Sequence, residues 1–314
     1  MLRTTALRKI FVTTLTLFVL LTIYLIPTLE EENVLRTNLE VEEITGISTN
    51  NIYLLNQDGY LVKSRILLDE EKVEDNIYKI LQNLTISENS KFSSGLRALI
   101  PENTKVKEII YGGEIVTINF SKEFLDVEVT YEKQMITSIV YSILDIDSIK
   151  GVSILVEGES LLEYPNTHEK LPSVLDKSIG INKKYSLTSR DNISKVVIYY
   201  IEDIDNDYYY VPVTKYINDD RDKIKIIVEE LSTSYIYEDN LMSFLNNKTK
   251  LLDYKEEGSV LFLNFNDYIF DGNDKILEEV IYTISYSAFD NYDVDMVMFE
   301  VNGKEIQHIS RNEI

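Results

Sequence analysis

Few side chains in this sequence have the types and spacing that catalysis or metal binding requires. The chain has two histidines, His168 and His308, and no cysteine, so it can form neither a disulfide nor a thiolate metal site. Neither histidine has the spacing of a metal-binding pair, and we interpret both as solvent-exposed polar residues. The sequence also contains no Gly-x-Ser-x-Gly elbow and no glycine-rich phosphate loop. We therefore predict no cofactor, no bound metal and no enzymatic activity.

The acidic residues suggest two further kinds of chemistry. The segment 203–207 (DIDND) resembles the start of a calcium-binding loop. However, Tyr208 stands where that loop needs glycine and Thr214 where it needs a bidentate glutamate, so we interpret the segment as a solvated hairpin turn. Paired carboxylates can also cleave glycosidic bonds. A carboxylate-dependent wall hydrolase is therefore an alternative, and it requires two buried acids that face each other in one pocket.

Tyrosines gather in the predicted hairpin that surrounds this acidic turn. Alternation along the strands sends some of them to solvent, where amphipathic aromatic side chains favour protein contacts. The alternative is that they cover the edge of the sheet and the adjoining helix. The candidate interface residues are Tyr199, Tyr200, Tyr208, Tyr209 and Tyr210.

The hairpin belongs to a chain that repeats itself. Residues 96–158 and 241–303 align at a constant offset of 145 residues without any gap, and 15 of the 63 aligned pairs are identical. Unrelated sequences would share roughly 4 identities, and the offset matches the common size of a domain. We predict two tandem small domains, residues 51–163 and 194–314, joined by a linker over 164–193 that packs loosely on both.

Each copy shows the same order of hydrophobic patterns. Period-two alternation around turn residues predicts two hairpins and a closing strand, and apolar residues three and four apart predict two helices. This order indicates an α+β fold in which helices pack on one face of a mixed β-sheet. The predicted elements are 52–62, 73–84, 105–120, 134–144 and 152–156 in the first copy, and 196–213, 224–231, 250–265, 276–288 and 294–301 in the second.

The N-terminus is predicted to be a membrane anchor. Residues 10–29 are uncharged and mostly apolar, and they are long enough to cross a bilayer core of about 30 Å. Basic residues precede the segment and acidic ones follow it, which places the N-terminus in the cytoplasm and the bulk of the chain outside it. We predict a cytoplasmic tip and transmembrane helix over 1–33 and a spacer over 34–50. A cleaved signal peptide is the alternative. The net charge of −22 argues against nucleic-acid binding.

Several motifs resemble the GerM domain of sporulation and spore germination proteins from Gram-positive bacteria. They are Ile-Pro-x-Asn-Thr-Lys-Val at 100–106, Val-Thr-Ile-Asn-Phe-Ser at 116–121 and Val-x-Ile-Leu-Val-Glu-Gly at 152–158. The second copy keeps Leu-Asn-Phe at 263–265 and Phe-Glu-Val-Asn-Gly at 299–303 but lacks the proline. The resemblance implies a fold similar to ring-building modules of secretion and sporulation assemblies, in a membrane-tethered protein outside the cytoplasm.

From the resemblance and the missing catalytic residues we expect a structural or assembly component of an envelope complex. Its expected partners are the membrane, through the N-terminal helix, other proteins of the complex and possible further copies of the chain itself. The alternative is an extracytoplasmic binding module for a small molecule or a cell-wall glycan, with an aromatic-lined cleft at the 164–193 junction. Many members of the family are lipoproteins, and this chain departs from them because it has no cysteine.

Overall fold

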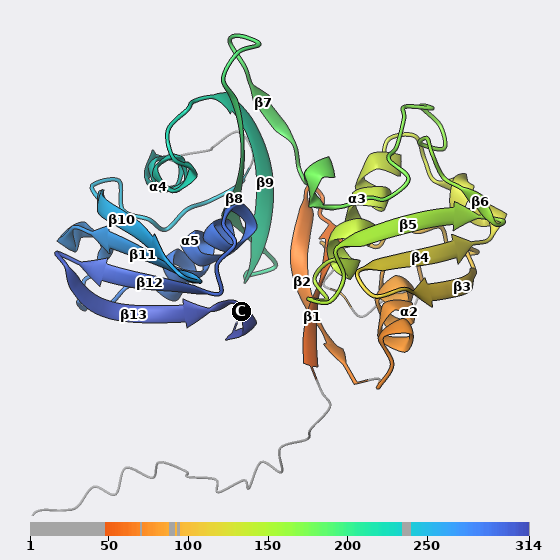
Figure 1. Cartoon of the computed structure of the whole chain (residues 1–314), viewed down its shortest axis with the longest axis horizontal. Coiled ribbons are helices and arrows are strands. Elements are labelled where there is room, and N and C mark those ends of the chain that lie inside the picture. The colour runs from red at the N-terminus through yellow and green to blue at the C-terminus, as the bar shows by residue number, and fades with distance from the viewer. Residues whose placement is uncertain (1–47, 70, 88–91, 93–94, 234–239, 314) are drawn as a thin grey trace, which may run out of the picture. The chain divides into compact units, whose positions relative to one another are not determined.

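The computed structural model describes residues 48–69, 71–87, 92, 95–233 and 240–313 (Figure 1). The predicted anchor and most of the spacer lie outside these residues. Within the described part, no helix is both long and apolar enough to cross a membrane. Residues 46–314 form one compact unit, which contains both copies of the repeat.

Both copies contain the predicted elements in the predicted order. The first copy has β1 (Ser48–Leu55), β2 (Leu61–Leu68), α2 (Val73–Asn83), β3 (Val106–Tyr111), β4 (Ile115–Phe120), α3 (Glu132–Ile143), β5 (Gly151–Val156) and β6 (Glu159–Ser160). The second has β8 (Ile193–Ile204), β9 (Asp207–Asn218), α4 (Lys223–Thr233), β10 (Leu251–Glu257), β11 (Val260–Phe265), α5 (Glu278–Asn291), β12 (Met296–Val301) and β13 (Lys304–Ser310). The tandem α+β architecture is therefore confirmed.

A four-stranded mixed sheet closes each copy. The strand orders are β3-β4-β5-β6 and β10-β11-β12-β13, with a parallel pair in the middle and antiparallel strands on both sides. The turn after the third strand explains two of the repeated residues. Gly158 and Gly303 have φ values of 88° and 79°, which favour glycine. Their N–H groups donate at 2.9 Å to Asn119 and Asn264, so each repeated asparagine fixes a repeated glycine.

The first hairpin of each copy does not join this sheet, which differs from the single sheet that we expected. Instead β2 pairs antiparallel with β9, so the two hairpins share a central sheet (Figure 1). In this sheet β1 lies on the outer side of β2, and β8 pairs with β9. An unpaired strand edge exposes main-chain donors and acceptors. The pairing of β2 with β9 satisfies some of these groups in both hairpins. Residues 50–56 are buried without alternation, as expected for a strand covered on both faces.

Helices cover the two remaining edges of the central sheet. Ser142 of α3 accepts a hydrogen bond from Tyr53 N at 3.0 Å, and Ser287 of α5 accepts one from Tyr199 N at 2.9 Å. Ser142 and Ser287 are aligned in the repeat, so one pair of identical residues performs the same task twice. The hydroxyls replace the neighbouring strand that a buried N–H would otherwise need.

The segment 164–193 is built into the fold more firmly than the predicted loose linker. Leu171, Leu175 and Ile181 are buried, and β7 (Lys184–Ser186) pairs in parallel with β9. Local periodicity failed to reveal this packing because the buried residues stand singly between turns. The segment contributes to the same hydrophobic core as both copies.

Candidate functional site at the interface between the repeats

Equivalent residues of the two copies meet at the interface between them. Residues 53 and 56 correspond to residues 199 and 202, since this part of the repeat is offset by 146 positions. Tyr53 shares a side-chain hydrogen bond with Tyr199, and Asn56 Nδ2 donates to Glu202 Oε2 at 2.5 Å. Contacts between equivalent residues are the mark of a two-fold, isologous interface. The interface thus has the symmetry of a homodimer within one chain.

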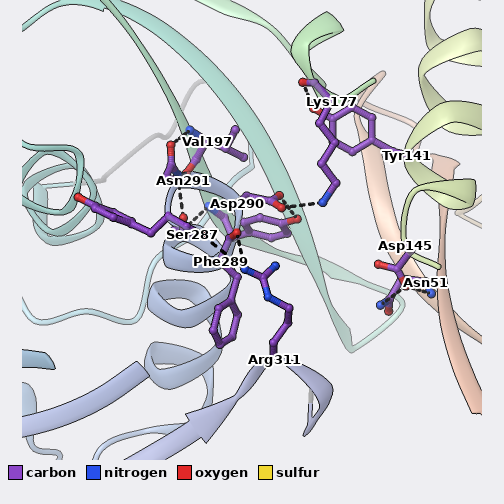
Figure 2. A network of polar contacts seen from close by, with 12 residues as sticks. Asn51, Tyr141, Asp145, Lys177, Val197, Ser287, Phe289, Asp290, Asn291 and Arg311 are labelled. Carbon is purple, nitrogen blue, oxygen red and sulfur yellow. Dashed lines mark hydrogen bonds and ion pairs between the residues drawn. The ribbon is translucent and has the colours of Figure 1, made fainter. Parts of the chain in front are cut away.

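A buried carboxylate organises the polar centre of this interface (Figure 2). Asp290 accepts a hydrogen bond from the Tyr199 hydroxyl at 2.8 Å and forms an ion pair with Lys177, also at 2.8 Å. Burial alone would favour the neutral acid, but these two partners hold the pKa of Asp290 below its ordinary value. Burial, reinforced by Asp290, raises the pKa of Tyr199. Asp290 is therefore ionised and Tyr199 is a neutral donor at neutral pH.

The aligned aspartate of the first copy makes different contacts. Asp145 accepts hydrogen bonds from Asn51 N at 2.7 Å and from Asn51 Nδ2 at 3.0 Å. In the second copy, Asn291 takes over the main-chain contact, because its side chain bonds both N and O of Val197. Asp290 is consequently released from fixing its own strand and is available to Lys177.

Lys63 lies beneath the tyrosines of this interface. Its ammonium is 3.4 Å from the centroid of the Tyr286 ring and 5.8 Å from that of Tyr199, which is cation–π geometry. Its strand position pairs with Tyr210. Burial lowers the pKa of Lys63 to about 8, although Asp145 and Asp290 favour the charged form. Tyr141, aligned with Tyr286, packs edge-on against Tyr53 of its own copy.

A groove of 1140 Å³ runs beside this centre, between the copies. The first copy lines it with Leu144, Asp147 and Lys150, and the second with Ser259, Met296 and Arg311. The junction segment contributes residues 176–178, and the aromatic lining comes from Phe289 and Tyr292 instead. The groove holds charges of both signs and therefore selects no single ligand charge.

A separate cavity of 760 Å³ lies at the turns of the two central hairpins. Its lining includes residues 56–58 from the first turn, 202–205 from the end of β8 and the second turn, and 240–244. Glu202 is 5% exposed, whereas Asp58, Asp203 and Asp205 are exposed. Burial raises the pKa of Glu202 to about 7 despite the hydrogen bond from Asn56. Glu202 is thus a carboxylate of the interface whose neutral form is favoured by burial.

The five candidate tyrosines are divided between the interior and the surface. Tyr199 and Tyr200 are 2% and 0% exposed, so their contacts are made within the chain. Tyr210 is half-buried against Tyr282 and Tyr286 of α5. Tyr209 is also half-buried, and Tyr208 is 48% exposed beside Phe244. Of the five tyrosines, Tyr208 is therefore the most accessible to a partner protein, and such a contact stays a prediction.

The remaining candidates lie apart from one another. His168 is exposed and faces Glu163 at 3.2 Å, and His308 is exposed on β13. In the described ranges, no cluster of three histidine or acidic side chains has the arrangement of a metal site. The acidic segment 203–207 contains the predicted tight turn, in which Asp205 and Asn206 have positive φ values.

Comparison with known proteins agrees with this duplicated architecture. A family model described as "Germane: Sporulation and spore germination" matches residues 51–162 and again residues 197–307. The chain belongs to this family. It is 26% identical over 274 residues to the Spore germination protein GerM of Bacillus subtilis (strain 168), which covers 84% of this chain and 74% of that protein.

A solved structure shares the Germane fold over both copies. The tandem GerMN domains of the sporulation protein GerM from Bacillus subtilis match with a TM-score of 0.76 and 24% sequence identity. The match covers 84% of this chain and 97% of the solved one. The suspected family and the tandem arrangement of its domains are therefore confirmed.

Sequence reasoning missed the charged residues of the interface. Lys177 lies in a segment without periodicity, and Lys63 and Glu202 lie on strands where nothing local distinguishes them from solvent-facing residues. The available signal was the repeat itself, because Tyr141/Tyr286 and Asp145/Asp290 are among its identical pairs. That signal shows which positions are retained, whereas the contacts between the copies depend on how the hairpins pair.

Proposed function

We propose that this chain is a noncatalytic protein of sporulation or spore germination, anchored in the cell membrane with its N-terminus in the cytoplasm and its bulk outside. The observation that carries the proposal is the family match over both copies, together with a relative named Spore germination protein GerM. The apolar segment 10–29, with basic residues before it and acidic ones after it, supports the anchor and its orientation.

Within an envelope complex the protein acts by binding other proteins or further copies of itself. The described surface offers aromatic side chains for such contacts, among them Tyr208 and Tyr185, which are 48% and 63% exposed. The noncatalytic role is supported by the family match and by a sequence without a nucleophile elbow or a glycine-rich phosphate loop.

Deletion of the gene in a spore-forming host tests the role in the life cycle. The deletion strain is expected to fail in spore formation or in germination, and the full-length chain is expected to restore both. A strain that sporulates and germinates normally would count decisively against the proposal. Complementation with residues 46–314 behind a cleavable secretion signal tests the anchor separately, because this chain reaches the same compartment without being tethered.

A second candidate function is supported by the 760 Å³ cavity, whose size suits a small ligand. In this role the protein binds a small molecule or a fragment of cell-wall glycan outside the cytoplasm. Thermal unfolding of the purified chain with defined wall fragments tests the glycan version. An unchanged unfolding temperature at millimolar fragment would remove glycan from consideration.

A further inference from the structure

The cavity at the hairpin turns combines a concave shape with charges of one sign. Among the described residues that line it, every ionisable side chain is a carboxylate: Asp58, Glu202, Asp203 and Asp205. Both copies line the cavity, since Asp58 belongs to the turn after β1 and the others to the end of β8 and the turn that follows it. Asn240 Nδ2 donates to Asp58 at 2.9 Å and ties the third lining segment to the first turn. Low-dielectric walls of one charge concentrate ions of the opposite charge.

Glu202 is incompletely satisfied within the protein. It is 5% exposed, and Asn56 is its hydrogen-bond donor, at Oε2. Its other carboxylate oxygen, Oε1, has no hydrogen-bond partner among the described residues. Buried carboxylates are normally paired with a cation, and here the protein supplies only a neutral amide. A cationic group that enters the cavity would provide the missing partner.

Part of the cavity wall is apolar. It consists of Ile204, Leu241, Met242 and Phe244, of which the first two are buried and the others half-buried. A hydrated metal ion gains no binding free energy from an apolar wall, whereas a ligand with a hydrocarbon body is stabilised by burying apolar surface against it. The volume of 760 Å³ exceeds the needs of a single ion.

We propose that this cavity binds an organic ammonium group carried on an apolar body, with the ammonium at Glu202 and the body against Leu241, Met242 and Phe244. Free amines and the amino groups of peptides share this chemistry. The inference deepens the binding role described as the second candidate function and leaves the genetic test of the first unaffected. The raised pKa of Glu202 adds a pH dependence, because the carboxylate pairs with a cation only when it is ionised.

The test compares hexylammonium with 1-hexanol, which has the same hydrocarbon body without the charge. Both are titrated calorimetrically into the full-length chain in nanodiscs at pH 8, and empty nanodiscs correct for partition into lipid. Hexylammonium is expected to bind the wild-type protein at least about tenfold more tightly than hexanol, which corresponds to one charge pair of modest strength. Equal binding of the two probes would overturn the proposal.

Two variants locate the binding. Glu202→Gln keeps the shape of the side chain and an acceptor for Asn56, and it is expected to weaken hexylammonium binding about tenfold while leaving hexanol unchanged. Between pH 6 and pH 8 the wild-type affinity should rise about tenfold, as a group with a pKa near 7 ionises, and the variant should show no such rise. The control Glu163→Gln removes an exposed carboxylate elsewhere and should bind like the wild type. Undiminished binding by Glu202→Gln would refute the proposed site, and a circular dichroism spectrum that matches the wild type shows that this variant is folded.

A peptide amine is distinguished from a free amine by the same design. A dipeptide with an apolar first residue is compared with its N-acetylated form. Tighter binding of the free N-terminus places peptide amines among the ligands. Equal, negligible binding of both peptides, with hexylammonium still bound, confines the site to amines without a peptide backbone.

Discussion

The titration of Glu202 predicts that the protein loses stability as the pH rises through the weakly acidic range. The folded state raises the pKa of this carboxyl from 4.5 to about 7 because the group is buried without a cation. Between these two values the unfolded chain has released the proton that the native chain still holds. Stability therefore falls from about pH 4.5 upward, and the loss is complete above about pH 7. Replacement by glutamine removes the titrating group and should abolish this part of the pH dependence.

The expected size follows from the shift in the pKa. One pKa unit corresponds to about 1.4 kcal/mol, so the full shift is worth about 3 kcal/mol between the limits. Most of this change in unfolding free energy occurs between pH 5 and pH 8. Relative to the wild type, Glu202→Gln is thus expected to gain about 2 to 3 kcal/mol of unfolding free energy over this interval. The hydrogen bond from Asn56 survives the substitution, because the glutamine amide also has an acceptor oxygen.

Urea unfolding of residues 46–314 at pH 5 and pH 8 measures the effect. Tyrosine fluorescence and far-ultraviolet circular dichroism are suitable probes, since the chain has 22 tyrosines and no tryptophan. The comparison is the difference between variant and wild type at each pH, which cancels the contributions of all other acids. Glu163→Gln, at an exposed ion pair with Lys170, serves as control and should shift stability by less than about 1 kcal/mol at either pH. A variant-to-wild-type difference that stays constant with pH would show that Glu202 is not perturbed by burial.

Three further substitutions test the interface and the covered sheet edges. Ser287→Ala removes the acceptor of a buried strand N–H and should cost about 1 to 3 kcal/mol of unfolding free energy, whereas Ser232→Ala on α4 should change it by less than about 0.5 kcal/mol. Lys63, whose pKa is lowered to about 8, makes wild-type stability rise with pH from about 8 to 10.5, because the unfolded chain binds the extra proton there. Lys63→Met should flatten this rise in urea titrations, and an unchanged slope would contradict the burial of the ammonium. Asp290→Asn leaves a buried interface without its anion and should lower unfolding free energy by about 1 to 3 kcal/mol, measured at pH 7.

The sequence predicts the elements of each copy well because every pattern occurs twice. A turn glycine such as Gly113 is ambiguous alone, but Gly258 stands at the same place in the second copy, and both have positive φ. The mixed sheet of each copy was also predictable, because a helix between two strands, as between β4 and β5, allows them to pair in parallel. Local periodicity and duplication together thus fix element types and their order.

The pairing between the first hairpins could not be predicted in the same way. Which edge meets β2 depends on the three-dimensional arrangement of both copies, and no local pattern encodes the choice of β9. The division of the tyrosine cluster between interior and surface could not be predicted for the same reason. Alternation places Tyr199 on one face of a strand, but whether that face meets solvent or the other copy depends on the pairing. The one sequence sign of burial, the non-alternating run in β1, is too short to interpret alone.

The symmetry of the interface explains why the functional candidates lie where the copies differ. At positions that keep the same residue, such as Ser142 and Ser287, each copy solves the same structural problem of covering a strand edge. On the two-fold axis between the copies, a residue faces its own equivalent. Two glutamates at positions 56 and 202 would repel each other, and two asparagines there would carry no charge. The chain instead places Asn56 against Glu202, which leaves a single negative charge there.

The aspartates follow the same logic. Asp145 and Asp290 remain identical, yet the change of the neighbouring position to Asn291 frees only the second of them for Lys177. Because the two copies lie in one chain, their sequences can differ, and charged residues can be placed on one side of the interface only. Two identical subunits of a homodimer cannot do this. A homodimeric interface would present two copies of each charge, and the buried carboxylate at the hairpin cavity would face its own like charge at close range. In this chain Asn56 faces Glu202, so one buried carboxylate, in place of two, remains to pair with a cation in the cavity.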